Sequence, residues 1–264
     1  MKKQHILITN DDGIYAEGIQ RLSQCLYENN SYRLTIVAPD RERSAVGHAI
    51  TMHRPLLVDE ISYLHNPDLK GYSVNGTPSD CVKLAIEAIL DDKPDLVISG
   101  INRGSNLGTD VLYSGTVSAA VEGLILDIPS IAISLTGNGS SASFDYAARF
   151  VCQLFPLLLD AELSTATLIN INVPTAVEKI KGVMATKLGN RRYRNAFEKR
   201  IDPRGRIYYW LAGELVEDDN EDLDADTRAV REGYISVTPI HFPLTNVNIL
   251  PALKNVLEKM NFKA

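Results

Sequence analysis

The stretch His5-Ile6-Leu7-Ile8-Thr9-Asn10-Asp11-Asp12-Gly13-Ile14 decides the fold expected for this chain of 264 residues. Its apolar run, residues 6–8, predicts a short buried strand near the N-terminus. An amide and two adjacent carboxylates follow, and Gly13 permits a tight turn before a helical apolar pattern at residues 16–26. A strand, an acidic turn and a helix in this order are typical of an open parallel sheet with a site at the carboxyl end of a strand.

The adjacent carboxylates of Asp11 and Asp12 repel each other, which raises the pKa of each unless a cation lies between them. Carboxylate oxygens are the ligands preferred by hard divalent ions such as Mg²⁺ and Mn²⁺. The alternative is a solvated turn in which an aspartate caps the following helix, a common use of this residue. These residues alone leave the metal site and the capped turn both open.

Strand and helix patterns alternate along the N-terminal part of the chain. Further strands are predicted at the apolar runs 34–38, 96–101, 128–135 and 167–173. Helices are predicted from the spacing of apolar or small residues at 81–90, 117–126 and 144–159. Residues 49–58 and 71–74 lack helical spacing and predict strands or a hairpin. The alternation predicts an α/β fold, with a doubly wound, Rossmann-like, mostly parallel sheet covered by helices on both faces.

The chain changes character after about Pro174, where strand-like segments and charged loops replace the alternation. We therefore expect a Rossmann-like catalytic domain at residues 1–180. Residues 181–264 would form a β-rich extension with a C-terminal helix that packs back on the core. Within it, residues 190–230 are predicted to project as an arm. Apolar and aromatic residues of this arm would be unfavourable in water, so we expect it to make an oligomer contact.

Composition excludes several classes of protein. Hydrophobic residues at 45% and charged residues at 23% are ordinary for a globular chain, and the net charge of -6 argues against a nucleic-acid polymer as partner. The three cysteines are widely spaced and form no CxxC, which argues against a disulfide framework or a zinc site. Neither a membrane-spanning run nor a signal-like segment occurs, so we expect a cytoplasmic protein without a membrane partner.

Three loops follow predicted parallel strands, at residues 10–13, 40–44 and 100–116, and a doubly wound sheet gathers such loops along one edge. In the third loop, Asn102 and Asn106 lie among glycines that let backbone amides approach an anion. Ser114-Gly115-Thr116 stands where a helix begins, so its N–H groups and hydroxyls make a phosphate-sized site. The alternatives are a flexible loop and a simple N-cap. An acidic turn and an anion site at one edge together indicate phosphoryl chemistry, which needs both.

Four motifs occur in order along the first half of the chain: residues 8–13, 38–44 with 47–51, 75–82, and 99–108 followed by 113–116. Together they resemble the SurE family, the stationary-phase survival proteins that act as 5'/3'-nucleotidases. The resemblance implies one divalent cation, Mg²⁺ or Mn²⁺, with the ligands Asp11, Asp12, Ser44 and Asn102. It implies phosphate binding by Asn10, Asn106, Ser114, Gly115 and Thr116. Asp11 and Asp12 are then the catalytic residues.

The resemblance further implies hydrolysis of nucleoside 5'- and 3'-monophosphates by a homodimer or homotetramer built through residues 190–230. Either water or a carboxylate attacks phosphorus. His48 either donates to the phosphate or leaving oxygen, or is structural. The alternatives in function are a nucleotide-binding module without turnover and a phosphoacceptor domain of the response-regulator kind. The latter needs a further aspartate after a later strand, where this chain has Ser99-Gly100-Ile101-Asn102.

Overall fold

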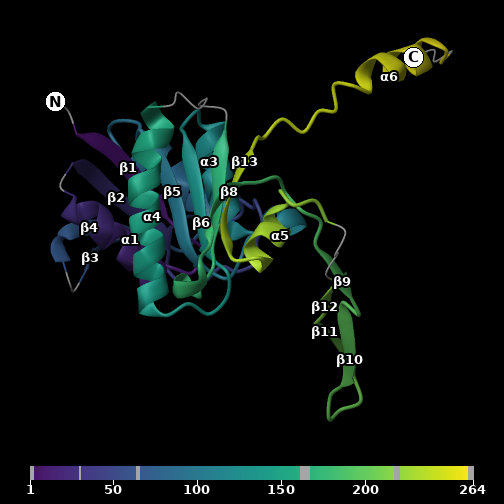
Figure 1. Cartoon of the computed structure of the whole chain (residues 1–264), viewed down its shortest axis with the longest axis horizontal. Helices are drawn as coiled ribbons and strands as arrows, with labels where there is room; N and C mark the ends of the chain where they lie inside the picture. The colour runs from purple at the N-terminus through teal and green to yellow at the C-terminus, as the bar shows by residue number, and fades with distance from the viewer. Residues whose placement is uncertain (1–2, 30, 64–65, 161–166, 217–220, 261–264) are drawn as a thin grey trace.

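A nine-stranded sheet forms the centre of the computed structural model, which describes residues 3–29, 31–63, 66–160, 167–216 and 221–260 (Figure 1). In spatial order the strands are β3 (Val58–Tyr63), β4 (Asn66–Val74), β2 (Tyr32–Pro39), β1 (Gln4–Thr9), β5 (Leu96–Arg103), β6 (Ser130–Leu135), β7 (Leu168–Val173), β13 (Tyr234–Ile240) and β8 (Gly182–Ala185). The run from β4 to β7 is parallel, whereas β3 and β13 pair antiparallel with their inner neighbours. The predicted α/β fold with a mostly parallel sheet is confirmed.

Helices cover both faces of the sheet, as the continuous apolar runs of its inner strands require. Helices α1 (Glu17–Glu28) and α4 (Ser141–Asp160) pack together on one face, in front in Figure 1. Helices α2 (Pro78–Leu84) and α3 (Gly115–Ile125) pack together on the other. Successive side chains of β1 point to opposite faces of the sheet. Ile6 and Ile8 pack on the side of α1 and α4, and Leu7 packs on the side of α2 and α3. Both faces are therefore buried by apolar side chains.

The strand order reverses between β1 and β5. The chain moves outward from β1 through β2 to one edge, then returns to β5 and moves outward through β6 and β7. Thr9 and Ser99 are partners at the end of the β1–β5 register. Ligands of doubly wound sheets bind outside the carboxyl ends of the strands at such a reversal. The fold thus places the acidic turn after β1 beside the asparagine-rich loop after β5.

The structure corrects the prediction for residues 49–58. Residues 49–57 form no strand, and the antiparallel pair is β3 with β4, beginning at Val58. The reason is that residues 49–57 contact the start of helix α2 through polar groups instead of adding to the sheet. The helix expected at residues 81–90 begins earlier, at Pro78. It continues as a π-helical turn, η1 (Ala85–Ile89), and starts with a capping box between Thr77 and Asp80.

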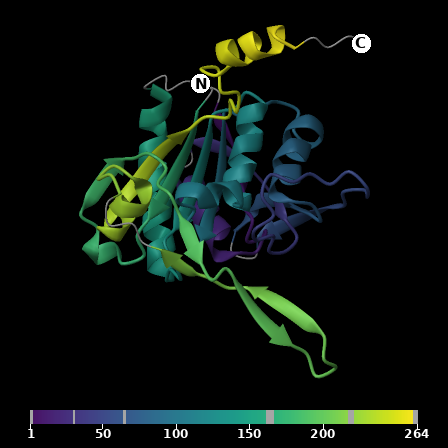
Figure 2. The same cartoon turned by 90° about the vertical axis from the view of Figure 1, so that its right-hand side faces the viewer.

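Beyond residue 180, β8 and β13 extend the main sheet, and helix α5 (Asp226–Arg231) packs on β13. The segment between β8 and α5 projects from the body as an arm (Figure 2). The arm contains the pairs β9 (Arg192–Arg194) with β12 (Glu214–Val216) and β10 (Phe197–Ile201) with β11 (Ile207–Leu211). Residues 217–220 of the predicted arm lie outside the described residues. No described helix is both long and apolar enough to cross a membrane.

The C-terminal helix differs from the expectation that it packs back on the core. Helix α6 (Leu250–Glu258) has no buried residue in the described chain and lies away from the sheet (Figure 1). Its apolar side chains, among them Leu253 and Val256, are about half exposed at 47% and 58%. The helix is amphipathic, but its apolar face meets no surface of the described part of its own chain.

Candidate active site

Residues from four separate parts of the chain meet at the carboxyl ends of β1 and β5. A cavity of about 200 Å³ is lined by Asp11, Ser44, Asn102, Asn106 and Ser114, together with Ala45, Arg103, Asp110 and Tyr113. Of the nine residues singled out from the sequence, five therefore line one cavity. Asp12, Gly115 and Thr116 lie directly behind this lining, through contacts to Asp11 and Arg103.

Asp11 joins the acidic turn to the first turn of α3. Thr116 donates its hydroxyl hydrogen to Oδ1 of Asp11 at 2.5 Å. A Cβ on Gly115 would lie 2.8 Å from Cβ of Asp11 and 2.9 Å from its Oδ2, closer than real Cβ contacts allow. Gly115 is needed here because only a residue without a side chain lets the start of α3 approach the carboxylate so closely. The acidic turn and the expected anion site are in contact.

The ionised form of both carboxylates is unfavourable in this environment. Burial raises the pKa of Asp11 to about 6, the charge of Asp12 adds to the rise, and the Thr116 hydrogen bond opposes it. Burial also raises the pKa of Asp12, while the backbone N–H of Arg103, 3.0 Å from Oδ2, lowers it. Among the described residues no lysine or arginine forms an ion pair with either carboxylate. The positive charge of Arg103 lowers the pKa of Asp12, but by less than burial raises it, so the negative charge of the pair is only partly compensated.

Ser44 and Asn102 are held by local hydrogen bonds. Ser44 donates its Oγ hydrogen to Glu42 at 2.6 Å, and Asn102 donates Nδ2 to the Gly104 carbonyl at 2.8 Å. Because Nδ2 of Asn102 is used in the second contact, the side-chain oxygen of Asn102 is the atom that can accept from, or bind, another group. The backbone N–H of Arg43 donates to the carbonyl of Asp11 at 2.7 Å, which attaches the Ser44 segment to the acidic turn.

Two of the residues expected to bind phosphate, Ser114 and Asn10, lie in different positions relative to the cavity. Ser114 caps α3, because its Oγ accepts from the Val117 N–H at 3.0 Å, and the hydroxyl hydrogen remains available for another acceptor. Asn10 does not line the cavity. Its amide donates to and accepts from Gly13, so it shapes the acidic turn.

Asn106 has its position fixed by residues that the sequence did not single out. Its backbone N–H donates to Oδ1 of Asn172 at 2.8 Å, and its carbonyl accepts from Asn170 and Asn172. Its side-chain amide donates to Ser134 at 2.8 Å. Asn170 and Asn172 are fully buried in β7. Polar residues inside an apolar strand pattern were the available signal, since a buried amide requires hydrogen-bond partners.

A second group of missed residues ties the site to the base of the arm. Asp110 lines the cavity and accepts from Arg191 at 2.8 Å and from the Tyr193 hydroxyl at 2.6 Å. Asp226 of α5 accepts from the backbone of Gly108 and of Gly189. Nothing in the spacing of these residues predicts the contacts, because most of them join segments far apart in the chain.

A wider cavity of about 550 Å³ lies on the arm side of the Gly104–Leu107 loop. Its lining includes Arg191 and Arg231 but none of the nine site residues. Only the smaller of these two cavities lies beside the paired carboxylates and the first turn of α3, so it is the candidate active site.

The residues present at the smaller cavity fit a hard divalent cation. The donor atoms available are carboxylate, hydroxyl and amide oxygens, and no lysine or arginine of the described residues forms an ion pair with the carboxylates. In the described part of the chain, no three side chains among His, Cys, Asp and Glu are placed to share a metal ion. Two carboxylates would thus need the neutral oxygens of Ser44 and Asn102 to complete a shell.

Comparison with known proteins agrees with this geometry. Residues 6–195 match the family described as survival protein SurE. The chain belongs to the SurE family. It is 57% identical over 259 residues to a protein of Pelotomaculum thermopropionicum named 5'-nucleotidase SurE, an alignment that covers 96% of this chain and 95% of that protein. A Carboxydothermus hydrogenoformans protein of the same name is 54% identical over 252 residues, 94% of each chain.

A solved structure shares the fold over nearly the whole chain. The crystal structure of the SurE protein from Aquifex aeolicus superposes with a TM-score of 0.80 at 39% identity. The superposition covers 96% of this chain and 99% of that one. The resemblance stated from the four sequence motifs is confirmed.

Proposed function

We infer that this SurE-family chain is a 5'-nucleotidase, which hydrolyses a nucleoside monophosphate to nucleoside and phosphate. The relatives named 5'-nucleotidase SurE align along almost the whole chain. One contact carries the inference from the structure: the Asp11 carboxylate accepts from Thr116 in the first turn of α3. Cation ligands and a helix N-terminus that favours anions are thereby adjacent, as a phosphate monoester requires.

We propose that Asp11, Asp12, Ser44 and Asn102 hold one divalent cation, Mg²⁺ or Mn²⁺. When bound, such an ion neutralises charge on the phosphate and makes a nearby water more acidic. Support comes from the oxygen-only donor set and from the raised pKa of both carboxylates. The choice between the two ions follows from a titration of activity with each.

The chain's own groups would orient the phosphate and the carboxylate. Ser114 keeps a hydroxyl hydrogen for a phosphate oxygen, and Asn106 lines the same cavity in a position fixed by Asn172. Thr116 uses its hydroxyl to hold Asp11 in place, so we assign it to orienting the carboxylate. Asn10 acts on phosphate only through the shape of the turn it stabilises. Attack by water and attack by a carboxylate are both compatible with this arrangement.

Release of phosphate from adenosine 5'-monophosphate and 3'-monophosphate tests the proposal. Wild-type protein treated with a chelator should be inactive, and added Mn²⁺ or Mg²⁺ should restore release. Asp12→Asn should abolish it, whereas the exposed Asp91→Asn should not. Nucleotide binding without phosphate release in wild-type protein would instead identify a binding module.

We propose that the arm associates with a second copy of this chain. Its hairpin β10–β11 exposes Phe197, Trp210 and Leu211 at 68%, 57% and 77%. An isolated two-stranded hairpin is marginally stable in water, and apolar side chains of this size favour a covering surface. A homodimer or homotetramer would supply one, and the apolar face of α6 has the same need.

A further inference from the structure

The segment that carries Ser44 has little anchorage in the core, since Leu56 alone among residues 41–60 packs against a core cluster and is itself only half-buried. Residues 41–60, all within the described part of the chain, are exposed or half-buried. The strands that border the site are instead anchored by buried apolar residues, for example Ile8 of β1 and Ile98 of β5. A segment with few apolar contacts is positioned by its hydrogen bonds and ion pairs. The position of Ser44 relative to the cavity therefore depends on a small number of polar contacts.

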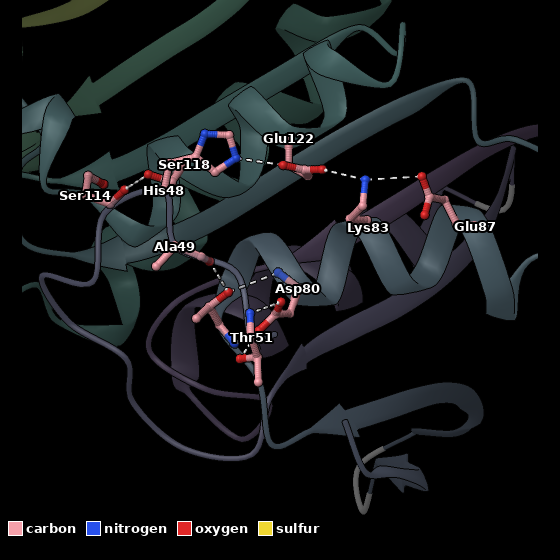
Figure 3. Close-up of polar contacts among 10 residues, drawn as sticks. His48, Ala49, Thr51, Asp80, Lys83, Glu87, Ser114, Ser118 and Glu122 are labelled. Atoms are coloured by element: carbon pink, nitrogen blue, oxygen red, sulfur yellow. Dashed lines mark hydrogen bonds and ion pairs between the residues drawn. The ribbon is translucent and has the colours of Figure 1, made fainter. Parts of the chain in front are cut away.

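One contact attaches this segment to α3. Nε2 of His48 lies 2.7 Å from Oε2 of Glu122 (Figure 3). The Glu122 side chain is buried at 6% exposure, and Lys83 of α2 lies 3.5 Å from its other oxygen. The His48 hydrogen bond, with help from Lys83, holds the pKa of Glu122 below its ordinary value. Glu122 is thus a buried, ionised acceptor directly beneath the segment.

Neighbouring contacts attach the same segment to α2 and to the loop before α3. Thr51 donates its backbone N–H at 2.9 Å and its hydroxyl hydrogen at 2.6 Å to the Asp80 carboxylate (Figure 3). Thr77 donates to the Ala49 carbonyl at 2.7 Å, and the Gly47 N–H donates to the Tyr113 carbonyl at 3.1 Å. Residues 47–51 are therefore held between α2 and α3.

The geometry points to His48 and Glu122 as positioning residues for the reaction. They fix the Ser44 segment to α3, whose first turn contains Ser114, Gly115 and Thr116. The proposed cation ligand Ser44 and the proposed phosphate site then keep a fixed separation, because one helix holds both. This assignment rests on the proposed function. His48 does not line the cavity, and its Nε2 is occupied by Glu122, so its action is through position and not through proton transfer to substrate.

Three variants separate positioning from other roles. His48→Ala removes the donor at a half-exposed site, so the protein should still fold. His48→Gln keeps an amide donor near the place of Nε2 but cannot carry the charge or proton chemistry of imidazole. His53→Ala is the matched control, since it removes an exposed histidine from the same segment. Thermal unfolding of each verifies that it is folded.

Hydrogen exchange of metal-free, substrate-free protein gives a readout that does not depend on activity. We expect His48→Ala to speed exchange in peptides spanning residues 44–52 about tenfold, the effect of losing one hydrogen bond to a charged group. His48→Gln should exchange within about threefold of wild type by the same reasoning. His53→Ala should not differ from wild type. Unchanged exchange in His48→Ala would overturn the proposal.

Steady-state kinetics on adenosine 5'-monophosphate with Mn²⁺ complete the test. His48→Ala should lower kcat/KM about tenfold or more, because misplacement of a ligand segment is costly, and His48→Gln should recover most of the loss. Equal loss in both variants, with exchange restored in His48→Gln, would show a chemical role for imidazole and overturn positioning. If wild-type protein hydrolysed no nucleoside monophosphate, the proposed function would fail, and the exchange comparison would still decide whether His48 fixes the segment.

Discussion

Replacing Asp11 with asparagine should make the metal-free protein more stable while removing its activity. Burial and the Asp12 charge raise the pKa of Asp11 from its ordinary 3.8 to about 6. At pH 7.5 the folded protein must ionise this buried carboxylate, and the difference in pKa corresponds to a penalty of roughly 3 kcal/mol. An asparagine side chain at this position would keep an oxygen for the Thr116 hydroxyl and carry no charge. As an upper limit, Tm should rise by about 5–10 °C for a chain of this size.

The dependence on pH follows from the same pKa. Because the folded pKa is raised, the folded protein binds more protons than the unfolded chain between pH 3.8 and about 6. Asp11 therefore lowers stability as pH rises through that window, and its full penalty is present above about pH 6. The stability advantage of Asp11→Asn should be larger at pH 7.5 than at pH 5, by roughly 1 kcal/mol.

Thermal unfolding in a chelator, followed by circular dichroism at pH 5 and pH 7.5, measures this advantage. Asp91→Asn, at an exposed position, serves as the control for removing one negative charge from the chain. Added Mn²⁺ should raise the Tm of wild-type protein but not that of Asp11→Asn, since a ligand stabilises only the state that binds it. A Tm below wild type for Asp11→Asn at pH 7.5, or an advantage that does not depend on pH, would refute the reasoning.

Three further changes probe the site and the arm. Gly115→Ala places a Cβ 2.8 Å from Cβ of Asp11 and should lower kcat/KM by about 100-fold in a folded protein, which kinetics and circular dichroism would measure. Asn172→Ala leaves the backbone N–H and carbonyl of Asn106 without this partner and should cost about 2–4 kcal/mol in urea unfolding. The double change Phe197→Ser and Leu211→Ser alters an exposed cross-strand pair and should reduce the mass found by light scattering without unfolding the chain. An unchanged mass would remove the arm from the oligomer contact.

The sequence predicted those parts of the site that follow directly from a strand or a helix start. The acidic turn after β1 and the start of α3 were visible because apolar runs mark strand ends, and Gly, Ser and Thr mark a helix start. The fold class then places both at the same edge of the sheet. That Thr116 bonds Asp11, while Asn10 turns to Gly13, could not be predicted. Such choices depend on distances of a few ångströms between segments far apart in the chain.

Prediction failed where the chain leaves the regular alternation. Residues 49–57 contain apolar residues that suggested a strand, but Thr51 and Ala49 bond to the start of α2 instead. Local propensity cannot foresee this, because the competing partners, Asp80 and Thr77, belong to another element. For α6, the sequence indicated a C-terminal helix but not the surface that covers its apolar face. A periodic pattern predicts a buried face without naming the chain that buries it.

Helix α3 contacts both the buried Asp11 carboxylate and the segment that carries Ser44. Its first turn lies against Asp11, a carboxylate whose pKa is raised by burial, and Glu122, farther along the same helix, contacts the segment of Ser44 through His48. The helix is itself buried among α2 and the sheet, so it is a rigid reference for the acidic turn and the Ser44 segment, which also meet through the Arg43 N–H and the Asp11 carbonyl. A cation bound between the acidic turn and the Ser44 segment would remove the free-energy penalty of ionising Asp11. Because the Ser44 segment is already held in place, its ordering would not oppose binding. If the proposed cation binds there, the penalty relieved at Asp11 and the order maintained by Glu122 would both favour tight binding of a charged ligand at the β1–β5 reversal.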